Sequence, residues 1–193
     1  PENTLLPYGR MGHIEFEQDN ISIQTQYEFE LGFDLQTDWS GFPRHRITIP
    51  IRDENGTLVG VKGRLPKNTY YGLKCIDKER EETEPKYIYL YPCAKSQILY
   101  GLYKTQPYIQ EKNEIIICES EKGVMQLWDM GFKNAVGIGG HSLSSVQVKK
   151  ILNLNVDIII AYDKDVTEHE ILLECEKLTN KNITQKKNMY VNF

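Results

Sequence analysis

The chain has 193 residues, of which 40% are hydrophobic and 26% are charged, and its formal net charge is -4. This length suffices for one large domain or two small ones, and the composition is typical of a globular protein. No apolar run approaches the roughly 18 to 20 residues that span a bilayer, and the first residues lack the pattern of a secretory signal. We therefore expect a cytoplasmic protein with no membrane partner. The four cysteines are scattered without a CxxC pair, which argues against a zinc site or a disulfide framework.

The acidic net charge hides a basic segment between residues 44 and 86, where few acids occur before the run 77–84. A local basic surface on an acidic protein is typical of an enzyme that handles polyphosphate with bound divalent cations. A solvated strand face is the alternative. The basic residues of this segment are Arg44, Arg46, Arg52, Lys62, Arg64, Lys67, Lys74 and Lys86.

The first half of the chain predicts a helix and a β-hairpin. We expect the helix over residues 22–31, capped by Asp19 and Asn20 and ended by Gly32. Alternating β-branched residues predict the hairpin, and Pro50 within its first strand favours an edge position or a bulge. The hairpin comprises strands 46–51 and 57–62 and the turn 53–56.

Three further elements are expected before the pattern changes. Residues 77–85 are charged and predict an exposed loop, and residues 87–91 predict a short strand. Residues 95–105 predict a helix. Its buried face would carry Ile98, Leu99, Leu102 and Tyr103.

From residue 114 onward, strands and helices alternate. This order predicts a parallel sheet with right-handed crossovers, and function in such sheets gathers at the carboxyl ends of the strands. The change of pattern divides the chain into residues 1–110 and 111–193. The expected strands are 114–118, 134–138, 156–162 and 189–193, and the expected helices are 121–130, 144–152 and 166–178.

Three carboxylates follow strands of this second half. Glu119 comes directly after the first strand, and Asp163 and Asp165 follow the third. Sheet topology would bring the two strand ends together, and hard oxygen ligands of this kind suit Mg²⁺ or Mn²⁺ and the chemistry of phosphoryl transfer. Taken singly, each feature has a plainer interpretation: the Asp-x-Asp pair as a helix N-cap, and Glu119 as a surface residue.

The order of these segments resembles the Toprim domain, which bacterial-type primases, type IA and type II topoisomerases and some nucleases share. Residues 115–119, 135–140 and 158–165 carry the resemblance. It implies that the glutamate serves in acid/base or metal work and that the Asp-x-Asp pair holds a divalent metal. Those roles fall on Glu119, Asp163 and Asp165.

The preceding half resembles the catalytic core of bacterial-type (DnaG-like) DNA primases, through residues 46–64, 85–87 and 97–102. Residues 118–122 make phage or mobile-element primases the nearer type. The resemblance implies a mixed α/β N-terminal subdomain (1–110) followed by a Toprim domain with a Rossmann-like parallel sheet (111–193). It also implies synthesis of short RNA primers on a single-stranded DNA template from nucleoside triphosphates, with Mg²⁺ or Mn²⁺, and a replicative helicase as partner of the full-length protein.

On the same resemblance, five basic residues are expected to contact the nucleotide or the template. Arginine suits bidentate phosphate recognition, whereas lysine acts as a point charge. For Arg52 there is also a structural alternative: it is close enough in sequence to pair with Asp53 or Glu54 across the turn. The five residues are Arg46, Arg52, Lys62, Arg64 and Lys86.

The sequence also departs from the family pattern. The acid expected shortly after Glu119 is absent at Gly123, with Glu121 or Asp129 as substitutes, and a further aspartate is expected after the last strand, where the chain stops. We therefore expect a piece of a larger protein, with its Toprim domain truncated at the C-terminus. His141 is interpreted as a loop residue. A metal-dependent Toprim nuclease, or a non-catalytic module that binds nucleic acid or a replication partner, are the rival functions.

Overall fold

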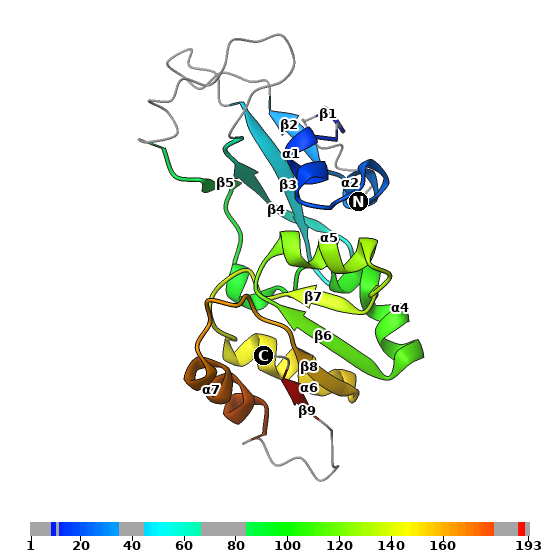
Figure 1. The fold of residues 1–193 in the computed structure, drawn as a ribbon, viewed down its shortest axis with the longest axis vertical. Coiled ribbons are helices and arrows are strands. Elements are labelled where there is room, and N and C mark those ends of the chain that lie inside the picture. Colours follow the sequence, from blue (N-terminus) through cyan, green and yellow to red (C-terminus); the bar gives the residue numbers. More distant parts are fainter. Residues whose placement is uncertain (1–8, 11, 35–44, 67–83, 180–188, 192–193) are drawn as a thin grey trace. The chain divides into compact units, whose positions relative to one another are not determined.

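The structure is a computed structural model that describes residues 9–10, 12–34, 45–66, 84–179 and 189–191. Two compact units make up the chain (Figure 1). Unit 1 comprises Pro1–Ile51 and Leu58–Cys93, and unit 2 comprises Arg52–Thr57 and Ala94–Phe193. The boundary expected between residues 110 and 111 falls near the end of a helix inside unit 2.

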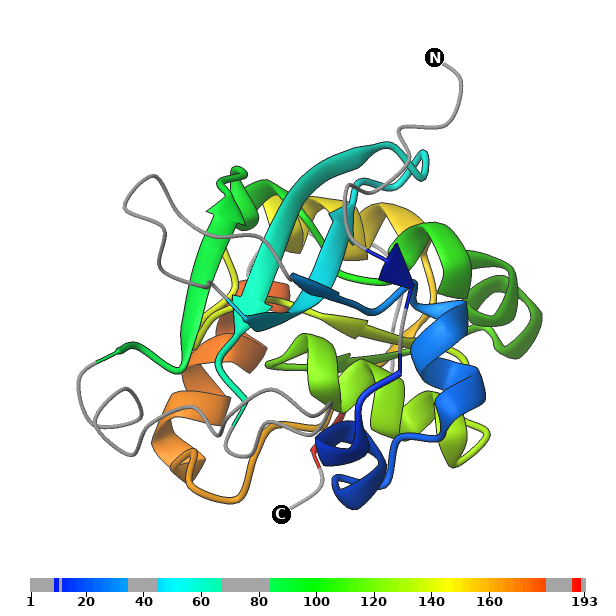
Figure 2. The same cartoon turned by 90° about the horizontal axis from the view of Figure 1, so that it is seen from above.

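Unit 1 contains an antiparallel sheet with the strand order β1-β2-β3-β4-β5. Strands β3 and β4 are its longest members and form the predicted hairpin (cyan in Figures 1 and 2). The strands are β1 (Gly9–Arg10), β2 (Gly32–Asp34), β3 (Arg46–Arg52), β4 (Leu58–Arg64) and β5 (Tyr87–Tyr91), and the helices are α1 (Ile14–Gln18) and α2 (Ile23–Glu28).

Two details of unit 1 differ from the sequence-based expectation. The N-cap of α2 is Ser22, whose Oγ accepts a hydrogen bond from the Thr25 amide at 3.2 Å, so Asp19 does not cap it. Strand β3 lies between β2 and β4 and is not an edge strand. Strand β2 pairs only with residues 46–48, so Pro50 lies beyond that pairing, where no ladder hydrogen bond to β2 is lost.

The helix predicted over residues 95–105 is wrong in its position. The chain forms the 3₁₀ helix η1 (Lys95–Gln97), and α4 (Leu102–Lys112) begins only after Gly101, whose φ of 84° is left-handed. Tyr100 exchanges two backbone hydrogen bonds with Gly137, at 2.8 and 3.1 Å. This strand-like pairing with a distant residue outweighs the local helical pattern.

Unit 2 contains a parallel sheet with the strand order β7-β6-β8-β9, which confirms the predicted alternation of strands and helices. The last strand expected from the sequence joins it as β9. The strands are β6 (Glu114–Cys118), β7 (Ala135–Gly137), β8 (Asp157–Ile160) and β9 (Met189–Val191), and the helices after α4 are α5 (Glu121–Asp129), α6 (Ser145–Leu154) and α7 (Glu168–Thr179).

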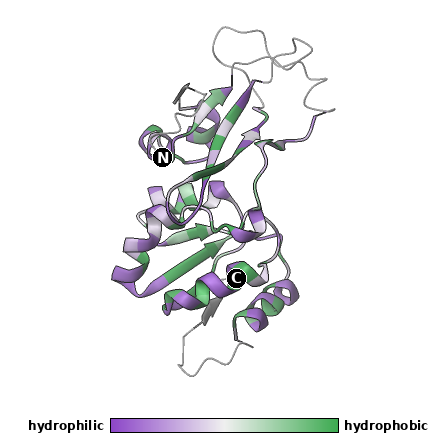
Figure 3. Cartoon of the chain, turned by 180° about the vertical axis from the view of Figure 1, so that it is seen from behind, coloured by the Kyte–Doolittle hydropathy of each residue, from purple (hydrophilic) through white to green (hydrophobic). Residues whose placement is uncertain are grey.

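Strands β6 and β7 are buried on both faces, which explains why they are continuous apolar runs (Figure 3). Ile115 and Ile117 belong to a buried cluster to which α4, α6 and α7 also contribute. Helix α5 packs so close to β6 that a Cβ on Gly123 would meet the Cys118 sulfur at 3.2 Å. In the described part of the chain, no helix combines the length and the apolar character needed to cross a membrane.

Candidate functional site

The carboxyl ends of β6 and β8 bring two of the predicted acids together. Ile117 and Ile160 are neighbours in the parallel ladder, and the Ala161 amide donates to the Ile117 carbonyl at 2.8 Å. One residue past β6, the Glu119 Oε1 atom accepts a hydrogen bond from the Asp163 amide at 3.1 Å. The two strand ends are therefore joined by one of the candidate carboxylates itself.

Glu119 is held in place from three directions. Its side chain is only 12% exposed, and its carbonyl accepts from the Gly139 amide at 2.9 Å. Its Oε2 atom lies 3.5 Å from the Nδ1 atom of His141, whose own side chain is fully exposed. The loop histidine thus lies beside the glutamate, as its position after the Gly139-Gly140 turn at the end of β7 permits.

Asp163 and Asp165 are exposed in the turn after β8. They do not cap the following helix. Thr167 does so, because its Oγ accepts from the Glu170 amide at 3.3 Å while the Glu170 carboxylate accepts from the Thr167 amide at 2.9 Å. These bonds from Thr167 lower the pKa of the Glu170 carboxyl. The N-cap interpretation of the Asp-x-Asp pair is therefore excluded.

The three acids do not form a preassembled metal cage. In the described ranges, no group of three or more histidine, cysteine, aspartate or glutamate side chains is placed to hold an ion. Mg²⁺ is usually bound by one or two carboxylates plus waters and substrate phosphates, and the donor chemistry of Glu119, Asp163 and Asp165 fits such an open site. Of the suggested substitutes for the missing acid, Glu121 is buried at the start of α5, and Asp129 ends α5 at the other edge of the sheet.

Two groups that sequence reasoning missed lie near this edge. The Tyr162 hydroxyl is buried and has no hydrogen-bond partner among the described residues. Its pKa is raised, first by burial and then by the charges of Glu174 and Glu119. Glu174 is itself buried and accepts hydrogen bonds from Ser142 Oγ at 2.8 Å and the Leu143 amide at 2.9 Å. It therefore fixes the loop that carries His141.

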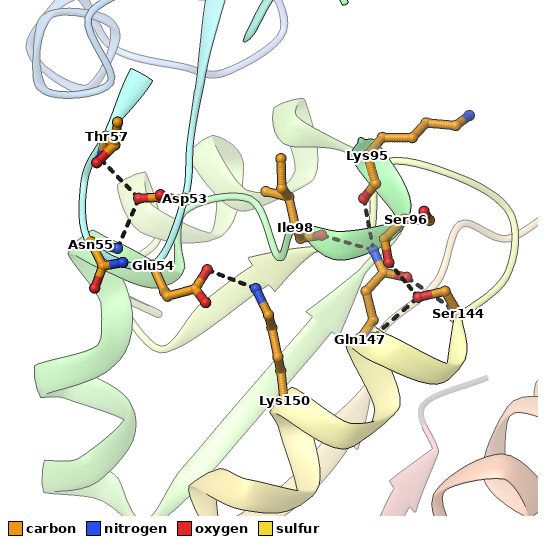
Figure 4. A network of polar contacts seen from close by, with 10 residues as sticks. All are labelled: Asp53, Glu54, Asn55, Thr57, Lys95, Ser96, Ile98, Ser144, Gln147 and Lys150. Atoms are coloured by element: carbon orange, nitrogen blue, oxygen red, sulfur yellow. Dashed lines mark hydrogen bonds and ion pairs between the residues drawn. The ribbon is translucent and has the colours of Figure 1, made fainter. Parts of the chain in front are cut away.

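The turn between β3 and β4 forms a polar network with α6 inside unit 2 (Figure 4). The Asp53 Oδ1 atom accepts from the amides of Asn55 and Thr57, both at 2.9 Å. Glu54 pairs with Lys150 of α6 at 2.7 Å. Arg52 donates to the Gly56 carbonyl at 2.8 Å, so its guanidinium closes the turn through a backbone oxygen.

Gln147 is the centre of the second half of this network (Figure 4). Its Nε2 atom donates to the carbonyls of Ile98 and Ile138, both at 2.8 Å, and its backbone amide is bonded to the capping residue Ser144. Ser144 Oγ in turn donates to the Ser96 carbonyl. This buried amide ties η1 and the end of β7 to the start of α6, and thereby positions the loop of residues 139–143.

Two of the predicted phosphate-binding arginines are buried in unit 1. Arg46 is 2% exposed, pairs with Glu84 at 2.8 Å and donates to the Pro85 carbonyl at 3.0 Å. Arg64 is paired with Asp19 at 3.0 Å and lies 3.6 Å from the carboxylate of Glu15. These contacts favour a structural role for both arginines, and contact with a nucleotide stays a prediction.

The two predicted lysines of unit 1 lie around one aromatic ring. The Lys62 ammonium is 4.7 Å from the centroid of the Tyr87 ring, and that of Lys86 is 5.8 Å from it. Lys86 is exposed and Lys62 is half-buried. The structure thus brings Lys62 and Lys86 together but leaves Arg52 in the other unit. Arg44, Lys67 and Lys74, and residues 77–83 of the expected loop, lie outside the described residues.

No family model matches the chain. Among curated proteins, it is 31% identical over 163 residues to the SPbeta prophage-derived protein YorJ of Bacillus subtilis, an alignment that covers 79% of this chain and 39% of that protein. It is 28% identical over 167 residues to a DNA primase of Staphylococcus aureus, covering 84% of this chain and 25% of the primase.

Solved structures give the same answer for the fold. The zinc-binding and RNA polymerase domains of the Aquifex aeolicus primase superpose with a TM-score of 0.69 at 21% identity, over 92% of this chain and 48% of that one. A DnaG primase catalytic domain bound to single-stranded DNA superposes with a TM-score of 0.68 at 21% identity, over 92% and 64%. Sequence and fold together relate this chain to DnaG-type primases.

The DnaG-like resemblance expected from the sequence is therefore confirmed, as is the expected α/β fold, a mixed first half followed by a parallel sheet. The prophage relative agrees with the expected phage or mobile-element type. The chain spans well under half the length of the two curated relatives. The chain therefore corresponds to only part of each of these two proteins.

Proposed function

We propose that this DnaG-like chain is the catalytic core of a primase, which joins ribonucleotides into short primers on single-stranded DNA by metal-dependent nucleotidyl transfer. The observation that carries the proposal is the bond from the Asp163 amide to the Glu119 carboxylate, which unites two acids at the carboxyl edge of the parallel sheet. In open α/β sheets this edge is where ligands bind.

Each acid has a distinct part in this proposal. Asp163 and Asp165 are exposed and would hold Mg²⁺ or Mn²⁺, with Glu119 as a further ligand or as a base. When bound, the metal neutralises charge on the triphosphate. Glu119 is oriented by the Asp163 amide and by His141, so its carboxylate is fixed before a substrate arrives.

The substrates and partners belong to the proposal as well. Among the described residues of unit 1, the ammonium groups of Lys62 and Lys86 are better suited than Arg46 and Arg64 to contact the phosphates of a template or nucleoside triphosphate, because both arginines are held in buried ion pairs. A replicative helicase would be a partner of the longer protein, and the cytoplasm its location.

A non-catalytic nucleic-acid-binding module is the second candidate. It is favoured by one observation: no three-ligand cluster exists among the described residues. Such a module would bind single-stranded DNA equally well in chelator, and it would not consume nucleoside triphosphates.

Metal binding is the first test. We would titrate Mn²⁺ into the wild-type chain, Asp163→Asn and the control Asp129→Asn, an exposed aspartate at the other edge of the sheet, and follow bound metal by electron paramagnetic resonance. We expect wild type and the control to bind Mn²⁺ and Asp163→Asn to lose it. Equal binding in all three would refute the assignment of Asp163.

Primer synthesis is then measured on a single-stranded template with and without nucleoside triphosphates. We expect triphosphate-dependent products from wild type and the Asp129→Asn control and none from Asp163→Asn. Degradation of the template without triphosphates would identify a nuclease. Template binding with neither reaction would support the non-catalytic module.

A further inference from the structure

We propose that a second surface of unit 2, remote from the acidic edge, binds a single-stranded nucleic acid. This inference rests on the proposed function for the choice of nucleic acid, and it adds a binding surface that the proposal does not contain. We name it the lysine–aromatic patch. It consists of Lys104, Tyr108 and Lys112 of α4, Trp128 of α5, and Phe132 and Lys133 beyond α5.

The patch is built on a helix face and an aromatic pair. Lys104, Tyr108 and Lys112 recur every four residues, so they lie on one side of α4. The Tyr108 and Trp128 rings meet edge to face with centroids 5.5 Å apart. The Lys133 ammonium lies 4.9 Å from the Trp128 centroid and 5.5 Å from that of Tyr108. Lys133 is therefore held over two rings that are themselves fixed.

Phe132 supplies an exposed ring beside this pair. It is 46% exposed, and its neighbour Met130 is 63% exposed. The turn that presents Phe132 is ordered, because its amide donates to the Leu127 carbonyl at 2.8 Å and Gly131 adopts a φ of 89°. The Lys112 ammonium lies 5.5 Å from the Phe132 centroid. The ordered turn therefore keeps the Phe132 ring partly exposed to solvent, with the Lys112 ammonium next to it.

The charges of Lys112 and Lys133 remain open to a ligand. Neither Lys112 nor Lys133 forms an ion pair with any residue in the described ranges, since both lie against ring faces and Lys112 otherwise donates to the Asn134 side chain at 3.3 Å. Acids occur nearby in sequence at Glu111, Glu114 and Asp129, so the surface is locally mixed in charge. A cation over a ring keeps its positive charge, which a carboxylate partner would neutralise.

The combination matches the chemistry of an unpaired nucleic-acid strand. Such a strand offers a phosphate and a flat base in each nucleotide, and proteins bind it with basic side chains and aromatic stacking platforms. An acidic peptide would satisfy the lysines but has no flat face for Phe132. A double helix would offer phosphates but no unstacked bases.

The patch is separate from the acidic edge within unit 2. Helix α5 starts next to Glu119 and runs to Asp129, and β6 begins after α4 has ended. Lys112, Phe132 and Lys133 therefore lie toward the amino edge of the sheet. The five residues of β6 place the two edges roughly 16 Å apart, at about 3.3 Å per strand residue. A bound strand here would not occupy the candidate metal ligands.

The test is binding of a fluorescent oligothymidylate to the full chain in chelator, measured by anisotropy over a range of salt concentrations. We expect the double variant Lys112→Gln/Lys133→Gln to bind roughly tenfold more weakly at low salt. The slope of log affinity against log salt should become shallower by about 0.7 for each lysine. Phe132→Ala should weaken binding roughly fivefold or more, and the loss should vanish with an abasic strand.

Lys149→Gln is the matched control, because Lys149 is an exposed lysine of α6 outside the patch. Circular dichroism establishes that each variant is folded. Wild-type affinity and salt slope in the double variant would overturn the proposal, as would failure of the wild-type chain to bind the strand. Because the binding assay is run in chelator, it does not depend on the proposed catalytic function. If the wild-type chain binds the strand through the patch but makes no primers, only the proposed catalytic function is refuted.

Discussion

The charged side chains of the hairpin in unit 1 and those at the carboxyl edge of unit 2 are used in opposite ways. Arg46 and Arg64 are buried and paired with carboxylates, whereas Asp163 and Asp165 are exposed after β8. In the sequence, both sets are charged residues in or shortly after predicted strands, and both are predicted to bind a ligand. Burial and partners separate them: the arginines hold unit 1 together, and the aspartates are open to a ligand.

The physical basis of this difference is desolvation. A charge withdrawn from water needs a partner of opposite sign, and removal of that partner is costly. An exposed carboxylate carries no such penalty, so selection for stability alone does not explain Asp163 and Asp165, whereas the largely buried Glu119 has the Asp163 amide as a donor. The comparison predicts that buried charges govern stability and exposed ones govern binding.

The largest expected effect is that of Arg46→Leu. Its removal takes the guanidinium donor away from the Glu84 carboxylate and the Pro85 carbonyl, so unit 1 should lose about 3 kcal/mol of unfolding free energy. Hydrogen exchange of the β3 amides measures this for unit 1 by itself. The exposed Lys86→Gln is the control and should stay within about 0.5 kcal/mol. Equal exchange in both variants would mean that the Arg46 pair contributes nothing.

Glu174→Gln tests the same principle inside unit 2. The buried carboxylate accepts from Ser142, from the Leu143 amide and from Lys177, and a neutral amide cannot accept from all three equally well. We expect a loss of about 2 kcal/mol, read from urea unfolding and from faster exchange of the Leu143 amide. Glu176→Gln, on the exposed side of α7, should change neither. An unchanged Leu143 exchange rate would show that Glu174 does not fix the loop.

The sequence was most informative where local pattern and tertiary structure agree. Strands buried on both faces must be apolar runs, so β6 and the alternation after it could be predicted. Their topology then placed Glu119 near Asp163.

The features that the sequence did not reveal have the opposite cause, since they depend on distant partners. Glu84, which pairs with Arg46, is 38 residues away, and Gly137, which holds Tyr100 extended, is 37 away. Neither partner can be inferred from neighbouring residues. The helix expected over residues 95–105 is a local inference that the contact with Gly137 overrides. The binding role that the resemblance implies for Arg46 is disfavoured by its buried pair and stays a prediction.

The smallest effect concerns an intermediate case, the ion pair of Glu54 and Lys150. The hydrogen bond from Lys150 is the main cause that holds the pKa of the Glu54 carboxyl below its usual value of 4.5. A carboxyl with a lowered pKa in the folded state adds stability above its unfolded pKa, and that stability is lost as the pH falls through the folded pKa. Glu54 is 42% exposed, so solvent screening limits the contribution to a few tenths of a kcal/mol.

Lys150→Met should therefore raise the pKa of Glu54 toward its usual value and remove this acid-dependent stability, while Lys149→Met should leave both unchanged. Carboxyl carbon NMR titration of Glu54 measures the shift directly. If Glu54 titrates identically with and without Lys150, the pair is a surface contact without energetic weight. In that case, even a half-exposed ion pair would add no stability, and only buried charges would stabilise the fold.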